Sequence, residues 1–176
     1  MSKGERTARG AAAAALLAVA AAGCAGTADG GGTVNGGDVP PSSVEQKADT
    51  LTRQALEAIR PATGGTRAAG AVPAGDGTWR KCTTETPGEH RFQYTYTRQL
   101  TVPQERTQAV LEAARAHFAQ QGYRADLPDP QNPRAGARDP HSSWWVAVGS
   151  TKGTGTMFVT ADSGCVFTTD DPPAAK

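Results

Sequence analysis

The stretch HRFQYTYTRQL, residues 90–100, decides the fold because it is the clearest β-strand in the chain. Aromatic side chains alternate with polar ones, which is the period of a strand that buries one of its two faces. Phe92, Tyr94 and Tyr96 are therefore expected to lie on one side of a sheet. The other side is expected to carry Arg91, Gln93, Thr95 and Thr97.

Residues 42–61, SSVEQKADTLTRQALEAIRP, have the apolar spacing of a helix. Steps of three and four residues place a single apolar stripe on one side of it. Ser42 and Glu45 fit a capping box at its start, and Pro61 is expected to end it. The stripe consists of Val44, Ala48, Leu51, Ala55, Leu56 and Ile59.

Residues 103–121, PQERTQAVLEAARAHFAQQ, predict a second helix. Thr101 and Gln104 fit another capping box, and Gly122 is the expected C-terminal glycine. The apolar face of this helix consists of Val110, Leu111, Ala114 and Phe118.

Three further strands are expected at residues 77–86, 144–150 and 156–168. Short turns at 86–90 and 151–155 would join the four strands into two hairpins, and strands joined by short turns pair antiparallel. The Pro- and Asp-rich stretch between the second helix and the third strand, YRADLPDPQNPRAGARDPHSS, is expected to be a long loop.

The order helix, two strands, helix, two strands predicts an α+β two-layer sandwich. We expect a four-stranded, mostly antiparallel sheet with both helices on one face. The single domain would span residues 42–170, followed by a disordered tail at 171–176.

Residues 1–23 have the layout of a secretory signal peptide. Lys3, Arg6 and Arg9 precede the apolar run Ala11 to Ala22, which is shorter than the ~20 residues of a spanning helix.

The sequence AAGC, ending at Cys24, resembles the bacterial lipobox, in which the cysteine becomes the lipidated first residue of the mature protein. Ala21 stands where that motif prefers Leu or Val. The alternative is an ordinary signal peptide cut nearby, such as after Ala22, which would leave Cys24 as a free thiol. Residues 24–41, rich in Gly, Thr and Pro, are expected to be a flexible tether.

The remaining cysteines, Cys82 and Cys165, are an even pair in a chain that we expect to be exported. A structural disulfide between them is therefore the main prediction. The alternative, a redox or nucleophilic thiol, lacks a CxxC motif.

Charge and motifs exclude several classes of function. With 18 Lys+Arg against 17 Asp+Glu, the chain lacks the basic excess of a dedicated nucleic-acid binder. His90, His117 and His141 do not have metal-ligand spacing, and no GxSxG or SxxK serine motif occurs. We therefore expect no catalytic residue, no metal and no cofactor.

Acidic residues in the long loop leave two interpretations open. They could supply oxygen ligands to calcium, although the D-x-D-x-D-G pattern is absent, or they could form Asp-Pro turns. These residues are Asp126, Asp129 and Asp139.

Trp144 and Trp145 are adjacent in a predicted strand, so their side chains must point to opposite faces. One of the two could therefore serve as a contact anchor on the open face of the sheet. The alternative is that residues 124–142 fold over that face and bury it.

Three features together resemble small actinobacterial lipoproteins of uncharacterised function. They are the lipobox-like start with its tether, the pattern W-x-x-C at Trp79 to Cys82, and the SGCV at Ser163 to Val166. The resemblance implies a disulfide-bonded α+β domain outside the cytoplasmic membrane and brings no active-site residue.

The sequence as a whole predicts an extracytoplasmic lipoprotein anchored in the cell membrane. The expected activity is non-enzymatic binding of an unknown protein or envelope ligand. A structural accessory of an envelope complex and a small envelope hydrolase are the alternatives.

Overall fold

The computed structural model describes residues 38–64, 74–83, 91–127, 133–151 and 155–173. All of them belong to one compact unit, Gly32–Lys176. The predicted signal peptide, Cys24 and most of the predicted tether lie outside the described residues, as do the turn at 86–90, His90, Asp129 and most of the second turn, residues 152–154.

Helix α1 spans Pro41–Ile59, and the predicted apolar stripe faces the core. The predicted capping box of Ser42 and Glu45 is wrong. The N-cap residue is Pro40, and no side chain forms a capping hydrogen bond at this end of the helix. Glu45 instead accepts a hydrogen bond from the Trp79 indole at 2.9 Å. Pro61 ends the α-helix, but helical structure continues for one more turn. Pro61 lies in the first turn of a 3-10 helix, Arg60–Thr63, where the missing N–H needs no partner.

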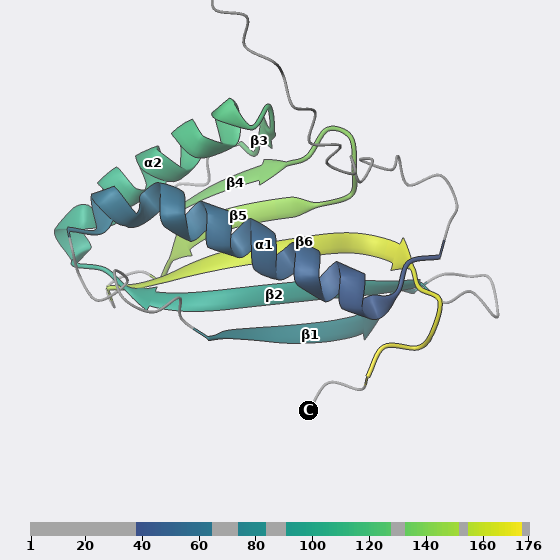
Figure 1. The fold of residues 1–176 in the computed structure, drawn as a ribbon. Helices are drawn as coiled ribbons and strands as arrows, with labels where there is room; N and C mark the ends of the chain where they lie inside the picture. The colour runs from purple at the N-terminus through teal and green to yellow at the C-terminus, as the bar shows by residue number, and fades with distance from the viewer. Residues whose placement is uncertain (1–37, 65–73, 84–90, 128–132, 152–154, 174–176) are drawn as a thin grey trace, which may run out of the picture. The chain divides into compact units, whose positions relative to one another are not determined.

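The described part of the chain forms a sheet of six antiparallel strands, not the predicted four (Figure 1). Their order across the sheet is β1-β2-β6-β5-β4-β3. The strands are β1 (Gly75–Lys81), β2 (Arg91–Thr101), β3 (Arg124–Ala125), β4 (Arg134–Arg138), β5 (Trp145–Ser150) and β6 (Thr156–Phe167).

The two unpredicted strands, β3 and β4, come from the stretch expected to be a loop. In β4 the buried positions of the strand are alanines. Ala135 and Ala137 are buried toward the helices, whereas Arg134 and Arg138 are exposed. Small side chains and nearby prolines conceal this pattern in the sequence, since alanine and glycine are poor strand markers.

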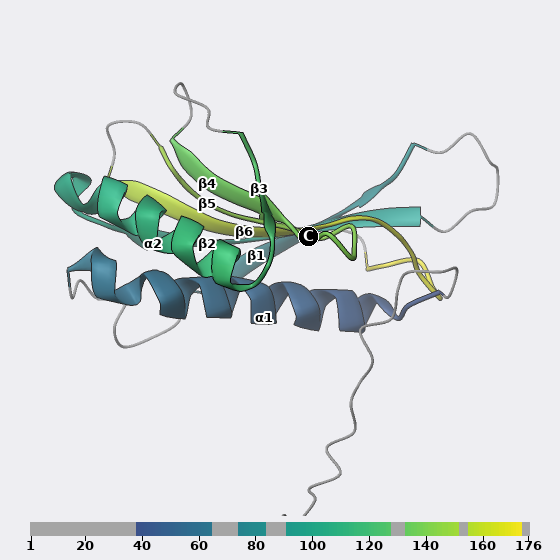
Figure 2. The ribbon, with the colours of Figure 1, turned by 90° about the horizontal axis from the view of Figure 1, so that it is seen from above.

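Helix α2 spans Thr107–Gln120 and buries the predicted apolar face. A 3-10 helix, Gln104–Arg106, precedes it, and Thr101 ends β2 without capping either helix. Gly122 has φ 73° and fills the predicted role at the helix end. Both helices lie on the same side of the sheet, so the fold is α+β with a helix layer on a sheet layer (Figure 2).

Strand β2 has the predicted two faces. Tyr94 and Leu100 are buried toward the helices. The Tyr94 ring leans toward Gly77 of β1, where a Cβ would lie 1.8 Å from the Tyr94 hydroxyl oxygen. A glycine at this place in β1 thus lets the tyrosine lie flat on the sheet, 4.7 Å from the Trp79 ring.

The core lies between the helices and the sheet. It draws on α1, α2 and the inner faces of β2, β4, β5 and β6. Its largest fully buried apolar side chains are Ile59, Val102, Val110, Leu111, Val146, Val148, Met157 and Val159.

The disulfide between Cys82 and Cys165 is present, with the two Cα atoms 6.2 Å apart. Cys82 follows β1 and Cys165 lies in β6, so the bond joins the two strands that flank β2. The two cysteines are 83 residues apart. The chain-entropy treatment assigns about 4–5 kcal/mol of stability to closing a loop of this size.

Among the described residues, one charged side chain is buried in the core. Arg98 of β2 is only 5% exposed and points toward α1. Its guanidinium forms an ion pair with Asp49, and its Nε donates to the Thr52 hydroxyl at 3.1 Å. The central carbon (Cζ) of the guanidinium also lies 5.0 Å from the centre of the Tyr96 ring. Because both acceptors belong to α1, these contacts attach the helix to the strand.

Removing the Asp49 carboxylate is expected to abolish its ion pair with the buried Arg98 guanidinium. We predict that Asp49→Ala lowers the free energy of unfolding by about 2–3 kcal/mol, less than for a fully buried pair because Asp49 is partly exposed. Arg53→Ala is the matched control. Arg53 pairs with the same carboxylate at 3.5 Å but is half exposed, so its loss should cost about 0.5 kcal/mol or less. Chemical denaturation measures both, and equal losses would contradict the account.

Candidate functional site

The face of the sheet that points away from α1 and α2 is the candidate site. In the described part of the chain no helix covers this face (Figure 2). Strand alternation and register place polar side chains across it in rows. They include Arg80, Gln93, Thr95, Thr97, Asp162, Thr160, Trp145, Arg134 and Arg138.

The two adjacent tryptophans lie on opposite sides of the sheet. Trp144 is 6% exposed and belongs to the core beneath α1. The Lys47 ammonium lies 5.2 Å from the centre of its ring, and burial lowers the pKa of Lys47, partly offset by the charge of Asp139. Trp145 begins β5 and lies on the open face, half-buried.

The segment 124–142 extends the sheet beside β5 through β3 and β4, apart from residues 128–132, which the structure does not describe. Asp126, which follows β3, contacts Trp145 from this side. Its carboxylate accepts a hydrogen bond from the indole nitrogen at 2.6 Å. The contact holds the indole in place on the open face and accounts for part of its burial.

Gly136 of β4 makes this hydrogen bond sterically possible. A Cβ there would lie 2.5 Å from the Asp126 carboxylate and 3.1 Å from the indole nitrogen of Trp145. Any larger residue would have to push the two side chains apart. The open face therefore depends on a glycine that the sequence shows only as part of an apparent loop.

Two arginines of β4 flank Gly136 on the same face. Arg138 lies 3.9 Å from the Asp126 carboxylate and is largely exposed. The Arg134 guanidinium lies 5.7 Å from the centre of the Trp145 ring. The Arg134 guanidinium forms no hydrogen bond or ion pair with another described residue. Its N–H groups can therefore still donate to a ligand.

The second carboxylate at the site, Asp162, is already surrounded by donors. It accepts from the Gln93 amide at 2.8 and 2.9 Å, the Thr95 hydroxyl at 2.7 Å and the Gly164 N–H at 2.8 Å. A carboxylate held in this way fixes its neighbours and is poorly placed to exchange protons with a substrate.

Together these side chains surround a shallow hollow of about 340 Å³. Its lining is Gln93, Asp126, Arg134, Arg138, Trp145, Asp162 and Gly164. Both carboxylates are engaged, whereas the arginines and the indole are still accessible. The arrangement thus suits recognition of a flat or anionic group better than acid–base catalysis.

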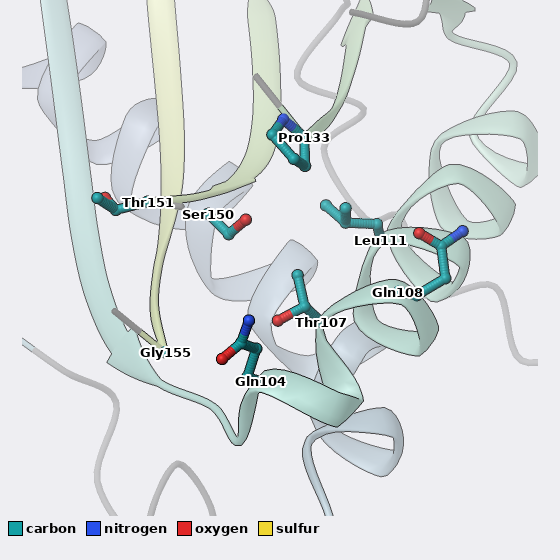
Figure 3. A pocket seen from close by; sticks show the side chains of 8 residues that line it. All are labelled: Gln104, Thr107, Gln108, Leu111, Pro133, Ser150, Thr151 and Gly155. Atoms are coloured by element: carbon teal, nitrogen blue, oxygen red, sulfur yellow. The ribbon is translucent and has the colours of Figure 1, made fainter. Parts of the chain in front are cut away.

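A second hollow of about 270 Å³ lies where α2 begins (Figure 3). Gln104 and Thr107 line it from the helical side, and Ser150 and Thr151 from the end of β5. None of the described residues that line it is charged. Its neutral amides and hydroxyls identify no particular ligand.

The other candidate residues are dispersed. Burial lowers the pKa of His117 on α2, and its ring lies 5.7 Å from that of Phe118. Within the described ranges, no group of three His, Cys, Asp or Glu residues could hold a metal ion. His141 is exposed and takes part in a turn through its backbone N–H.

The sequence left calcium binding and an Asp-Pro turn open for Asp139, and the structure shows the turn. Its carboxylate accepts from the His141 N–H at 2.9 Å and the Ser142 hydroxyl at 2.6 Å. Burial alone would raise the pKa of Asp139, but these hydrogen bonds and the nearby charges of Lys47 and His141 outweigh it and lower the pKa. The Asp126 carboxylate instead accepts the hydrogen bond from the Trp145 indole.

Comparison with known proteins gives no match to a family model, to a curated protein or to a solved structure. None of the described helices has the length and apolar character needed to span a membrane.

Proposed function

We propose that this protein is a lipid-anchored envelope protein whose open sheet face binds an anionic component of the cell wall. The observation that carries the binding function is the pairing of Trp145 with the accessible guanidinium of Arg134 on that face. An arginine with free N–H groups beside a flat ring suits a carboxylate or phosphate attached to a larger, partly apolar group.

The disulfide supports the extracytoplasmic location. A structural cystine is typical of proteins that fold in oxidising compartments. The lipobox-like sequence before Cys24 and the Gly-rich stretch after it support the anchor. A tether of this kind would hold the domain away from the bilayer, so the ligand is expected from the wall side and not from the lipid surface.

The hydrogen bonds of the two carboxylates support a non-enzymatic role. Asp126 and Asp162 are both engaged by donors from neighbouring side chains, so neither is poised as a general acid or base. The alternatives of an envelope hydrolase or a structural accessory have no comparable support from a specific contact.

The anchor is tested by replacing Cys24. We predict that Cys24→Ala, expressed in an actinobacterial host, is released into the medium because lipid can no longer be attached. Cell fractionation and immunoblotting follow the protein, and the parent chain is the control. Retention of Cys24→Ala in the membrane fraction at the level of the parent would contradict the anchor.

The ligand is tested with the full chain in detergent micelles, titrated with muramidase-solubilised cell-wall fragments. We predict that Arg134→Ala and Trp145→Ala each weaken binding by about tenfold or more, the value of one lost charge-assisted or aromatic contact. Gly136→Ala should act in the same direction, since it displaces Asp126 and Trp145.

Arg53→Ala removes an arginine from the helix layer and should leave the affinity unchanged. Calorimetry measures the affinities. Failure of the parent chain to bind wall fragments, or binding that Arg134→Ala leaves unchanged, would contradict the proposal. Binding to anionic lipid vesicles in place of wall fragments would also contradict it.

A further inference from the structure

The two edges of the sheet differ in length. One edge is β3, with two residues, and the other is β1, with seven. In the described part of the chain β1 pairs with β2 and with no other strand. An exposed edge strand of this length offers a row of backbone donors and acceptors to another strand.

The direction of these backbone groups follows from one hydrogen bond. The Cys82 N–H donates to the Arg91 carbonyl at 2.9 Å, so Cys82 faces β2. Alternation along an antiparallel strand then directs the groups of Asp76, Thr78 and Arg80 toward β2 as well. The residues between them therefore direct their N–H and C=O groups outward, and these are Gly75, Gly77, Trp79 and Lys81.

We propose that β1 pairs antiparallel with β1 of a second copy of this chain, about a two-fold axis beside Thr78. In this register Gly77 lies opposite the partner's Trp79, and Gly75 lies opposite the partner's Lys81. The Gly77 and Trp79 pairs can exchange backbone hydrogen bonds in both directions. The Gly75 N–H already donates to the Tyr96 hydroxyl, so each Gly75–Lys81 pair keeps the hydrogen bond from the Lys81 N–H to the Gly75 carbonyl.

Charge selects this register. With Thr78 on the axis, Asp76 lies opposite the partner's Arg80, and Arg80 opposite the partner's Asp76. Both residues are exposed, and neither forms an ion pair within the described part of the chain. They would meet at positions without backbone hydrogen bonds, where opposing side chains are closest.

Registers centred one residue away from Thr78 lose the pairing of Asp76 with the partner's Arg80. Centring the pair on Gly77 places Asp76 opposite the partner's Thr78, and centring it on Trp79 places Arg80 opposite the partner's Thr78. The strand GDGTWRK is therefore self-complementary about its middle residue, as a two-fold interface requires.

On the helix side of the strand, the partner's Trp79 would lie beside an aromatic ring, because the Tyr94 ring of the same chain covers Gly77. The Trp79 indole is held by Glu45 of its own α1. A two-fold axis normal to the sheet would keep all helices on one side. The two open faces would then form one continuous surface, although the pairing does not depend on what that surface binds.

Cysteine cross-linking of the full chain in membranes tests the register. We expect Thr78→Cys to give a covalent dimer on non-reducing gels, because the two residues face each other across the axis. Arg80→Cys alone should not, since its partner position is Asp76. Differently tagged Asp76→Cys and Arg80→Cys chains should cross-link when expressed together. The parent chain, with its other cysteines, sets the background.

Charge exchange tests the same interface without new cysteines. Asp76→Arg or Arg80→Asp alone should weaken association about tenfold or more, and the double variant Asp76→Arg/Arg80→Asp should restore it. Sedimentation of the full chain in detergent measures the association, and the intact Cys82–Cys165 disulfide confirms folding. A monomeric parent chain, single reversals that behave like the parent, or equal cross-linking by Thr78→Cys and Arg80→Cys would overturn the proposal.

Discussion

The buried guanidinium of Arg98 is the contact on which the arrangement of the two layers depends. It connects β2 to Asp49 and Thr52 of α1. A buried charge of this kind tolerates few alternatives, because every position of α1 that moved Asp49 away would break this ion pair. The helix is thus fixed both in its direction across the sheet and in its rotation about its own axis.

Fixing α1 also fixes which side of each strand is open. Once Tyr94 and Arg98 face the helix, Thr95 and Thr97 must face away, and the register extends this choice to the next strands. Asp162 lies opposite Thr95, and Trp145 lies opposite Asp162. The polar row that ends in the arginines of β4 is therefore a consequence of the same constraint that builds the core.

Much of this could be read from local patterns. The alternation at residues 91–97, the stripes of both helices and the even cysteine pair predicted the class of the fold, the helices and the disulfide correctly. These signals are strong because large apolar residues repeat with the period of one element.

The remainder was hidden because its signals are carried by small or distant residues. Strand β4 reads as Arg-Ala-Gly-Ala-Arg after a proline, and its pairing with β5 is a tertiary contact that no local pattern shows. The contact between Asp126 and Trp145 spans 19 residues and needs Gly136 on a third element. Arg98 resembles any polar strand residue until its partners on α1 are known.

The central claim is that one face of the sheet is packed under helices while the other is open and carries Trp145. Hydroxyl-radical footprinting of the full chain tests it directly, because Trp144 and Trp145 are neighbours with the same intrinsic reactivity. Tandem mass spectrometry gives their separate oxidation rates, each divided by the rate in the unfolded chain. The account predicts oxidation of Trp145 and strong protection of Trp144. Equal protection of both rings, or faster oxidation of Trp144, would contradict it.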